Sequence, residues 1–234
     1  MNTDDETRAV AERYARRTLA DQAADRYSLL RPEVWQMLQE RQRVQLQMMV
    51  RHGCTDLPAL RVTEVGCGTG GNLLELLRLG LAPQHLQGIE LLPERHVQAR
   101  CLLPGAVVLH LGDATRAPIA PASQDLVLQS TVFSSLLDDG FQQRLANTMW
   151  SWLKPGGAVL WYDFTVDNPR NADVRGVPLS RLRALCPQAS ISHRRVTLAP
   201  PLARLVCRWH PALYGVFNTL PLLRTHVLAW VEKT

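Results

Sequence analysis

Residues 62 to 72 read Val-Thr-Glu-Val-Gly-Cys-Gly-Thr-Gly-Gly-Asn, and this stretch determines how the rest of the chain is interpreted. A short apolar run is followed at once by glycines at 66, 68, 70 and 71 and then by a helical pattern. Glycine tolerates positive φ and lets a ligand approach the backbone, so the stretch predicts a strand, a tight nucleotide-binding turn and a helix. The same glycines also satisfy the Gly-x-Gly-x-x-Gly pattern of NAD sites, so by themselves they leave the nucleotide open.

From residue 60 onward, strand-like and helix-like segments alternate, which is typical of a parallel sheet covered on both faces. The expected strands are 61–65, 86–90, 106–110, 125–130, 157–164, 190–198 and 225–232, and the expected helices are 71–80, 93–103, 138–153, 179–185 and 202–219. The last two strands follow five βα steps and favour an antiparallel ending. We therefore predict an α/β three-layer sandwich, in which a mostly parallel seven-stranded sheet has an antiparallel last strand and helices on both faces.

The first 58 residues have a helical pattern that breaks near residues 28–31, which predicts an N-terminal helical cap over 1–58 and a core over 59–234. We expect a single domain overall, since 234 residues fit one α/β core. The stretch 200–224 combines apolar and aromatic residues with arginines. It is a candidate substrate lid, with a patch against lipid or ordinary packing as the alternatives.

Composition restricts which classes of protein the chain can belong to. The chain is 46% hydrophobic and 20% charged, as in folded soluble proteins, and its five scattered cysteines form no Cys-x-x-Cys pair. No metal site is expected. An acidic start without a signal-like segment, and a late apolar stretch shorter than the roughly 20 residues of a spanning helix, predict a cytoplasmic monomer or homodimer without an integral membrane segment. The net charge of +5 admits an acidic partner, but arginines spread through helical stretches indicate solvated faces and no nucleic-acid partner.

Three acidic residues narrow the choice of nucleotide. Glu90 ends the second expected strand, 20 residues beyond Gly70, where a carboxylate can accept hydrogen bonds from both ribose hydroxyls. Glu64 stands two residues before the first glycine, where it suits a ligand ammonium and would repel a pyrophosphate. Asp113 follows the third strand and can accept a hydrogen bond from the adenine amine. Together they match a zwitterionic adenosine ligand.

With these residues, positions 60–164 resemble the core of class I S-adenosylmethionine-dependent methyltransferases. Leu153-Lys-Pro-Gly-Gly157 is similar to the family's turn into its fifth strand, and Thr225 to Glu232 fills the place of its antiparallel seventh. The resemblance implies S-adenosylmethionine as cofactor and S-adenosylhomocysteine as product. By this likeness the cofactor would be bound by Glu64, Gly66, Cys67, Gly68, Gly70, Asn72, Glu90, Leu91, Gly112, Asp113, Ala114, Gln129, Ser130 and Thr131, with Val132 also flanking the methyl group.

The acceptor should lie above the fourth and fifth strands, because ligands of such sheets sit beyond the carboxyl ends. Asp163, near the end of the fifth strand, is the candidate general base; hydrogen bonding to the backbone of the following loop is the alternative. Residues 167–175 form a polar loop, and Asp167-Asn-Pro-Arg170 departs from the Asn-Pro-Pro-Tyr signature of nitrogen methyltransferases. The candidate acceptor residues are Tyr14, Val132, Asn168 and Arg175.

The sequence therefore predicts an enzyme that methylates oxygen or nitrogen of a small molecule, such as a secondary metabolite or a lipid or saccharide precursor. The apolar stretch 200–224 favours a partly hydrophobic acceptor. An RNA or protein methyltransferase is the alternative, suggested only by the pI near 9.2. A non-catalytic nucleotide-binding protein and an NAD-dependent oxidoreductase are less favoured. The oxidoreductase is disfavoured by Glu64 and by the absence of a Tyr-x-x-x-Lys motif.

Overall fold

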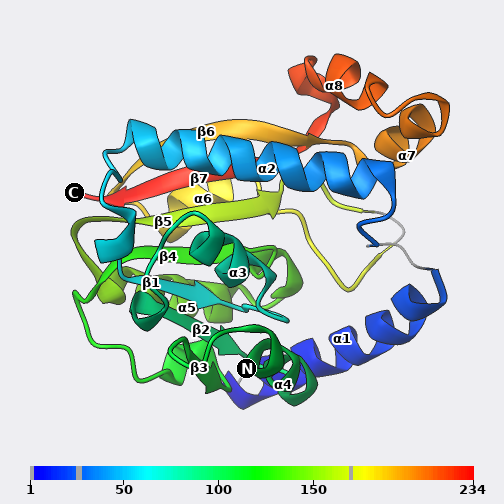
Figure 1. Cartoon of the computed structure of the whole chain (residues 1–234). Coiled ribbons are helices and arrows are strands. Elements are labelled where there is room, and N and C mark those ends of the chain that lie inside the picture. Colours follow the sequence, from blue (N-terminus) through cyan, green and yellow to red (C-terminus); the bar gives the residue numbers. More distant parts are fainter. Residues whose placement is uncertain (1–2, 25–27, 169–170) are drawn as a thin grey trace.

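A seven-stranded sheet organises the chain in the computed structural model, which describes residues 3–24, 28–168 and 171–234 (Figure 1). The strand order is β3-β2-β1-β4-β5-β7-β6. The first five strands are mutually parallel, and β7 is antiparallel to both of its neighbours. The strand bounds are β1 Val62–Val65, β2 Leu86–Glu90, β3 Val108–Leu111, β4 Gln124–Ser130, β5 Leu153–Phe164, β6 Ala189–Leu198 and β7 Arg224–Lys233.

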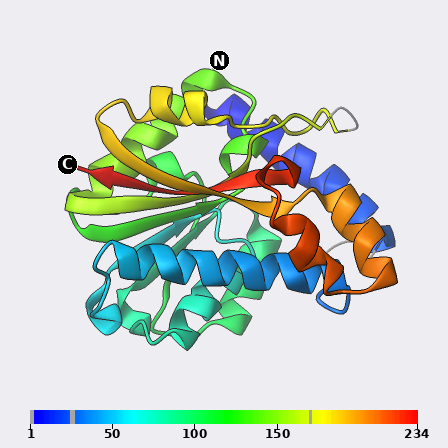
Figure 2. The same ribbon diagram turned by 90° about the horizontal axis from the view of Figure 1, so that it is seen from above.

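Helices cover both faces of the sheet, as Figure 2 shows from above. On one face, Met49 of α2 and Leu73 and Leu76 of α3 share a core with β1 and β4. On the other, α5 and α6 pack against the same strands. The helix bounds are α1 Thr3–Ala24, α2 Pro32–Arg51, α3 Gly71–Arg78, α4 Pro93–Leu102, α5 Asp139–Trp152, α6 Leu179–Leu185, α7 Pro200–Trp209 and α8 Leu213–Asn218.

The predicted fold class is confirmed: an α/β sandwich with seven strands, mostly parallel, whose seventh strand is antiparallel. One predicted element is wrong. The expected helix 202–219 is two helices, α7 and α8, separated at residues 210–212. A proline disfavours helical geometry in the residue before it, and His210, which precedes Pro211, is extended with φ −161 and ψ 134.

The strand β5 begins at Leu153, earlier than the expected residue 157. Leu153 already pairs with Gln124, and a register shift follows before Leu126 pairs with Ala158. The turn Lys154 to Gly157 therefore lies inside the strand as an irregularity.

The two N-terminal helices lie on opposite sides of the sheet (Figure 2). Val10 of α1 belongs to the core that α5 and α6 complete, whereas Met48 and Met49 of α2 belong to the core beneath α3. Only α1 reaches the cavity described below. Within the three described ranges, every helix is too short or too polar to cross a bilayer.

Candidate active site

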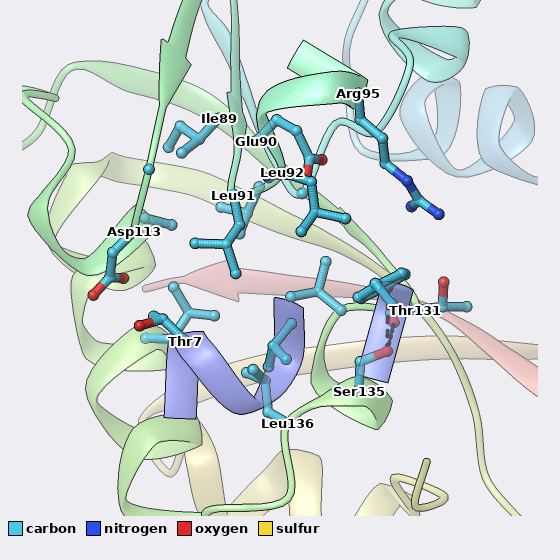
Figure 3. A pocket seen from close by; sticks show the side chains of 18 of the residues that line it. Thr7, Ile89, Glu90, Leu91, Leu92, Arg95, Asp113, Thr131, Ser135 and Leu136 are labelled. Carbon is cyan, nitrogen blue, oxygen red and sulfur yellow. Dashed lines mark hydrogen bonds between the residues drawn. The ribbon is translucent and has the colours of Figure 1, made fainter. Parts of the chain in front are cut away.

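A cavity of about 160 Å³ opens where β1, β2 and β4 end (Figure 3). Its space exceeds by far the roughly 10–15 Å³ that a single water needs, so it can take an organic ligand. In Figure 3, Glu90, Leu91 and Asp113 from the strand ends face Thr131 and Ser135 across it. It is lined by Thr7, Val10, Tyr14, Val65, Gly66, Ile89, Glu90, Leu91, Leu92, Arg95, Gly112, Asp113, Ala114, Ser130, Thr131, Val132, Ser135, Leu136, Phe141 and Leu145.

The glycine turn after β1 forms one wall of the cavity. Gly66, Gly68 and Gly70 have φ values of 64°, 58° and 89°, a region that side chains disfavour. At Gly66 there is also no room, because a Cβ would lie 2.6 Å from the Cγ2 atom of Val132. The glycines of this turn are therefore required by its positive φ values, and at Gly66 also by the lack of space for a side chain.

Glu90, at the end of β2, lines the cavity and holds the glycine turn. Its Oε2 accepts a hydrogen bond from the Gly68 amide at 2.7 Å, and its Oε1 accepts one from the Leu92 amide at 2.9 Å. An ionised carboxylate has about four acceptor positions, so two are left for ligand hydroxyls. The sequence predicted Glu90 as a ligand residue but gave no sign of this contact with the turn.

Asp113 closes the far end of the cavity, beyond Leu91. Its carboxylate accepts hydrogen bonds from the amide and the hydroxyl of Thr115, both at 2.8 Å, and so caps the turn at residues 114–116. The Gly112 amide donates to the backbone oxygen of Glu90 at 2.8 Å, which ties the ends of β2 and β3 together. Asp113 and Glu90 thus lie at two successive strand ends facing one space.

Glu64 is buried on the opposite side of β1 from its cavity-lining neighbour Val65, as strand alternation requires. Its Oε1 accepts a hydrogen bond from the side-chain amide of Asn72 at 2.5 Å, and its Oε2 has no hydrogen-bond partner among the described residues. Burial raises the pKa of Glu64 to about 7, against the lowering effects of the Asn72 hydrogen bond and of Arg41. An added cation at this position would favour the ionised carboxylate.

Arg41 of α2 links this buried acid to the end of β4. Its guanidinium donates to the side-chain oxygen of Asn72 at 2.7 Å and to the Ser130 hydroxyl at 3.3 Å. It also lies 5.3 Å from the ring centre of Tyr162. Sequence reasoning missed Arg41, because nothing in the α2 pattern indicates which of its arginines faces the sheet.

The loop after β4 forms the wall opposite Glu90. Thr131 has φ 57°, which is uncommon for a β-branched residue and indicates a conformation held by its surroundings. Its amide donates to the backbone oxygen of Tyr162 at 2.8 Å. Gln129 supports the same loop, accepting from the Val132 amide at 3.1 Å and donating to the Tyr162 backbone oxygen at 3.3 Å.

Helix α1 covers one side of the cavity with Thr7, Val10 and Tyr14. A buried ion pair fixes the helix there: Arg13 contacts Glu6 at 2.6 Å. Arg13 also donates to the backbone oxygen of Ser135 at 3.0 Å, and Glu6 accepts from the Leu137 amide at 2.9 Å.

Tyr14 was predicted from the sequence, and the structure brings it to the cavity. Its hydroxyl lies 3.2 Å from that of Ser135, and the Arg95 guanidinium lies 4.6 Å from its ring centre. Ser135, Arg95 and Thr7 were missed, since each lies outside the recognised motifs.

Asp163 lies behind the cavity wall and is not among the lining residues. Its carboxylate accepts hydrogen bonds from the amides of Ser134 at 3.1 Å and Phe164 at 3.0 Å. Burial raises its pKa to about 7, against these hydrogen bonds. The carboxylate thus bonds to backbone, as the alternative interpretation expected, but mainly supports the 131–136 loop after β4 and not the loop that follows β5. The role as a base stays a prediction.

The structure brings some of the remaining predicted residues to the cavity and not others. Asn168 and Arg175 do not line it, and the Arg175 guanidinium pairs with Asp139 instead. Of the predicted set, the cavity is lined by Gly66, Glu90, Leu91, Gly112, Asp113, Ala114, Ser130, Thr131, Val132 and Tyr14, whereas Glu64, Cys67, Gly68, Gly70, Asn72 and Gln129 lie outside this lining. No group of three metal-binding side chains occurs in the part of the chain that the structure describes.

The sheet order and the antiparallel β7 define an α/β fold with acidic residues at the ends of β1 and β2 and directly after β3. Residues 62–157 match a family model described as a methyltransferase domain. The chain therefore contains a stretch that matches a methyltransferase domain, within a fold that it shares with solved S-adenosylmethionine-dependent methyltransferases. No curated protein sequence gives a significant match.

Solved structures similar to this chain share its fold at low identity. A possible histamine N-methyltransferase from Thermotoga maritima is 16% identical, with a TM-score of 0.56 and coverage of 96% of this chain and 99% of that one. The geranyl diphosphate C-methyltransferase from Streptomyces coelicolor A3(2) is 14% identical, with a TM-score of 0.60 and coverage of 82% and 76%; it was solved with S-adenosylhomocysteine. The [4+2]-cyclase SpnF is 18% identical, with a TM-score of 0.57 and coverage of 82% and 80%. The fold alone therefore does not fix the reaction.

Proposed function

We propose that this protein transfers the methyl group of S-adenosylmethionine to an oxygen or nitrogen of a small, partly apolar molecule. The observation that carries the proposal is the row of carboxylates at successive strand ends, Glu64, Glu90 and Asp113, of which the last two line one cavity. Their spacing suits the amino, ribose and adenine parts of one ligand.

In this proposal the free acceptor positions of Glu90 bind the ribose hydroxyls, and Asp113 accepts a hydrogen bond from the adenine amine. The turn at Gly66 admits the methionine part of the cofactor close to the backbone. Glu64 lies behind the turn and attracts the ammonium group of the cofactor electrostatically. Its Oε2 is available for this because it has no hydrogen-bond partner among the described residues. Leu91 packs against the nucleoside.

The acceptor would lie between the loop after β4 and helix α1. That part of the wall offers the hydroxyls of Thr131, Ser135 and Tyr14 beside the apolar side chains of Val132 and Leu136. A mixture of this kind suits a molecule with one polar reacting group on an apolar body. The helical segment 1–58 contributes to the site as a cap, and the core begins at residue 59.

Methyl transfer is an in-line displacement on an activated carbon, so the protein contributes chiefly alignment and exclusion of water. Asp163 would act through the loop that it supports, because its carboxylate contacts the Ser134 amide rather than the cavity. An acceptor that must lose a proton would then give it to a cavity-lining group or to water.

Calorimetric titration with S-adenosylmethionine, S-adenosylhomocysteine and NAD tests the cofactor site. Binding of the first two and not of NAD is expected. Incubation of a cell extract with methyl-labelled cofactor then tests the acceptor class, and the label should enter the small-molecule fraction only in the presence of enzyme. Label confined to protein or RNA would overturn the acceptor proposal and leave the cofactor site intact.

A further inference from the structure

Large apolar side chains are exposed mainly at one place on the molecule. Among the described residues, 15 large hydrophobic side chains are exposed, and five of them fall within residues 200–223: Leu205, Trp209, Val216, Leu220 and Leu222. Three more, Leu29, Leu30 and Trp35, lie at the start of α2, and both views place that end of α2 beside α7 (Figures 1 and 2). We call residues 29–35 and 200–223 together, which include α7 and α8, the hairpin platform. The platform gathers eight of the 15.

Helix α7 has two distinct faces. Its inner face buries Ala203, Val206 and Cys207 in a small core of their own with Tyr214. Its outer face carries Leu205 and Trp209, four residues apart and therefore adjacent on the helix. Trp209 is 82% exposed. An exposed tryptophan beside leucines is typical of a surface that contacts a water–membrane boundary, where the ring is buried and the N–H stays hydrated.

The α7–α8 part of the hairpin platform lies in a stretch of sequence without acidic residues, and the nearby acid at the start of α2, Glu33, pairs with Arg31. Between Asp173 and Glu232 the sequence has no aspartate or glutamate and eight arginines. Two of them, Arg204 and Arg208, are exposed, adjacent to the apolar ridge of α7, and form no ion pair among the described residues. The surface therefore offers apolar side chains together with uncompensated positive charge.

Buried contacts with α2 hold the hairpin platform in place on the rest of the protein. The buried carboxylate of Glu40 in α2 accepts hydrogen bonds from the Tyr214 hydroxyl and the Asn218 amide, both at 2.7 Å, and from the Thr197 amide at 3.0 Å. Met37 of α2 packs against the same small core. The apolar residues are thus held outward by buried contacts, rather than exposed by a poorly packed segment.

We propose that the hairpin platform docks the enzyme on a bilayer that contains anionic lipid. An amphipathic surface with tryptophan, leucine and arginine binds the interface by apolar burial and by attraction to anionic head groups. A second copy of the chain is disfavoured as the occupant. A two-fold contact through α7 would bring Arg204 and Arg208 of both copies together, and the nearby acid, Glu33, is already paired with Arg31. The inference does not depend on which acceptor is methylated.

Flotation of the full chain with vesicles tests the proposal. We expect binding to vesicles of equal parts phosphatidylglycerol and phosphatidylcholine, and much weaker binding to phosphatidylcholine alone. Binding should weaken in about 1 M salt, where charge interactions extend only about 3 Å. Vesicles whose lipids carry brominated chains should quench tryptophan fluorescence, and most of that quenching should be absent in Trp209→Phe.

Matched variants separate the apolar contribution from the charged one. Trp209→Ser should weaken binding about 30-fold, from the loss of one buried large side chain. The double variant Arg204→Gln with Arg208→Gln should weaken it about 25-fold, which corresponds to about 1 kcal/mol for each arginine at an anionic surface. The controls Val97→Ser and Arg100→Gln change exposed residues of α4, which packs at the opposite edge of the sheet, and should bind as the wild type does.

Four results would overturn the proposal. The first is absence of flotation with either vesicle by wild-type protein that still binds S-adenosylmethionine. The second is equal weakening by the α4 controls and the platform variants. The third is a dimer in light scattering that Trp209→Ser dissociates, which would assign the platform to a second copy. Competition of vesicle binding by RNA, abolished in the arginine variant, would assign it to nucleic acid instead.

Discussion

Replacement of Glu90 by glutamine separates its two contacts. Glutamine keeps one oxygen that can accept from the Leu92 amide, but it sets an NH2 group against the Gly68 amide, which now donates to the Oε2 of Glu90 at 2.7 Å. The same change removes the negative charge that would bind the ribose hydroxyls. Both the glycine turn and the proposed cofactor contact are therefore affected.

The two effects have different sizes. One buried amide without an acceptor costs about 1–3 kcal/mol of the free energy of unfolding. Two hydrogen bonds to a charged acceptor are worth about 1.5–3 kcal/mol each, and an amide oxygen replaces part of this. A net loss of about 2–3 kcal/mol in binding corresponds to a Kd for S-adenosylmethionine about 30–150 times higher.

Calorimetry measures the Kd and urea unfolding measures the stability of the same samples. Glu94→Gln is the matched control, because Glu94 is an exposed acid four residues later and loses the same charge. The control should change the Kd less than about twofold, since surface substitutions usually act within about 0.5 kcal/mol. A folded Glu90→Gln protein with the Kd of the control would refute the ribose role.

Three other substitutions test other parts of the site. Gly66→Ala should lower the unfolding free energy by about 1–3 kcal/mol, because it combines φ 64° with a contact to Val132, while Gly71→Ala, with open space and ordinary φ, should not destabilise the protein. Glu40→Gln should cost about 1–3 kcal/mol in urea unfolding, as one of its three donors loses its acceptor; wild-type stability would contradict the network. The pKa of Asp163 is about 7 when folded against 3.8 ordinarily, so between these values the folded state binds more protons and stability falls as pH rises through 7. Asp163→Asn should flatten that slope between about pH 4 and pH 7. It should also lower kcat/KM and cofactor affinity together, whereas lost turnover at unchanged affinity would restore the general-base role.

The sheet was predictable from the sequence because its signals are local. Alternating apolar runs, the glycine turn and the acidic strand ends lie within about 100 residues, and each pattern is read over a few positions. The split of the helix at 202–219 was also encoded locally: Pro211 forbids helical geometry at His210. The prediction missed it because the apolar spacing continues across the proline.

The site was predictable on its strand side, and on its helical side only at Tyr14. Arg13 meets Ser135 across 122 residues of sequence, and Arg41 meets Ser130 across 89. Such contacts depend on how helices pack on the completed sheet. Helical periodicity in the sequence indicates which face of a helix is buried, but not which residues pack against that face. For Asp163, sequence reasoning left two interpretations open, and the structure supplied contacts for the backbone one.

The position of β7 between β5 and β6 has a consequence for synthesis of the chain. Among the described strands, β6 pairs with β7 alone, so residues 189–198 leave the ribosome with no strand to join. Until residues 224–233 follow, β5 and β6 each present an unpaired edge, and unpaired edges are templates for association with other chains. The α7–α8 hairpin is completed in that interval, because it lies between these two strands in the sequence. A nascent chain stalled before residue 224 would therefore carry the full nucleotide cavity on an unfinished sheet, and loss of the final strand would be expected to cause aggregation before it affects cofactor binding.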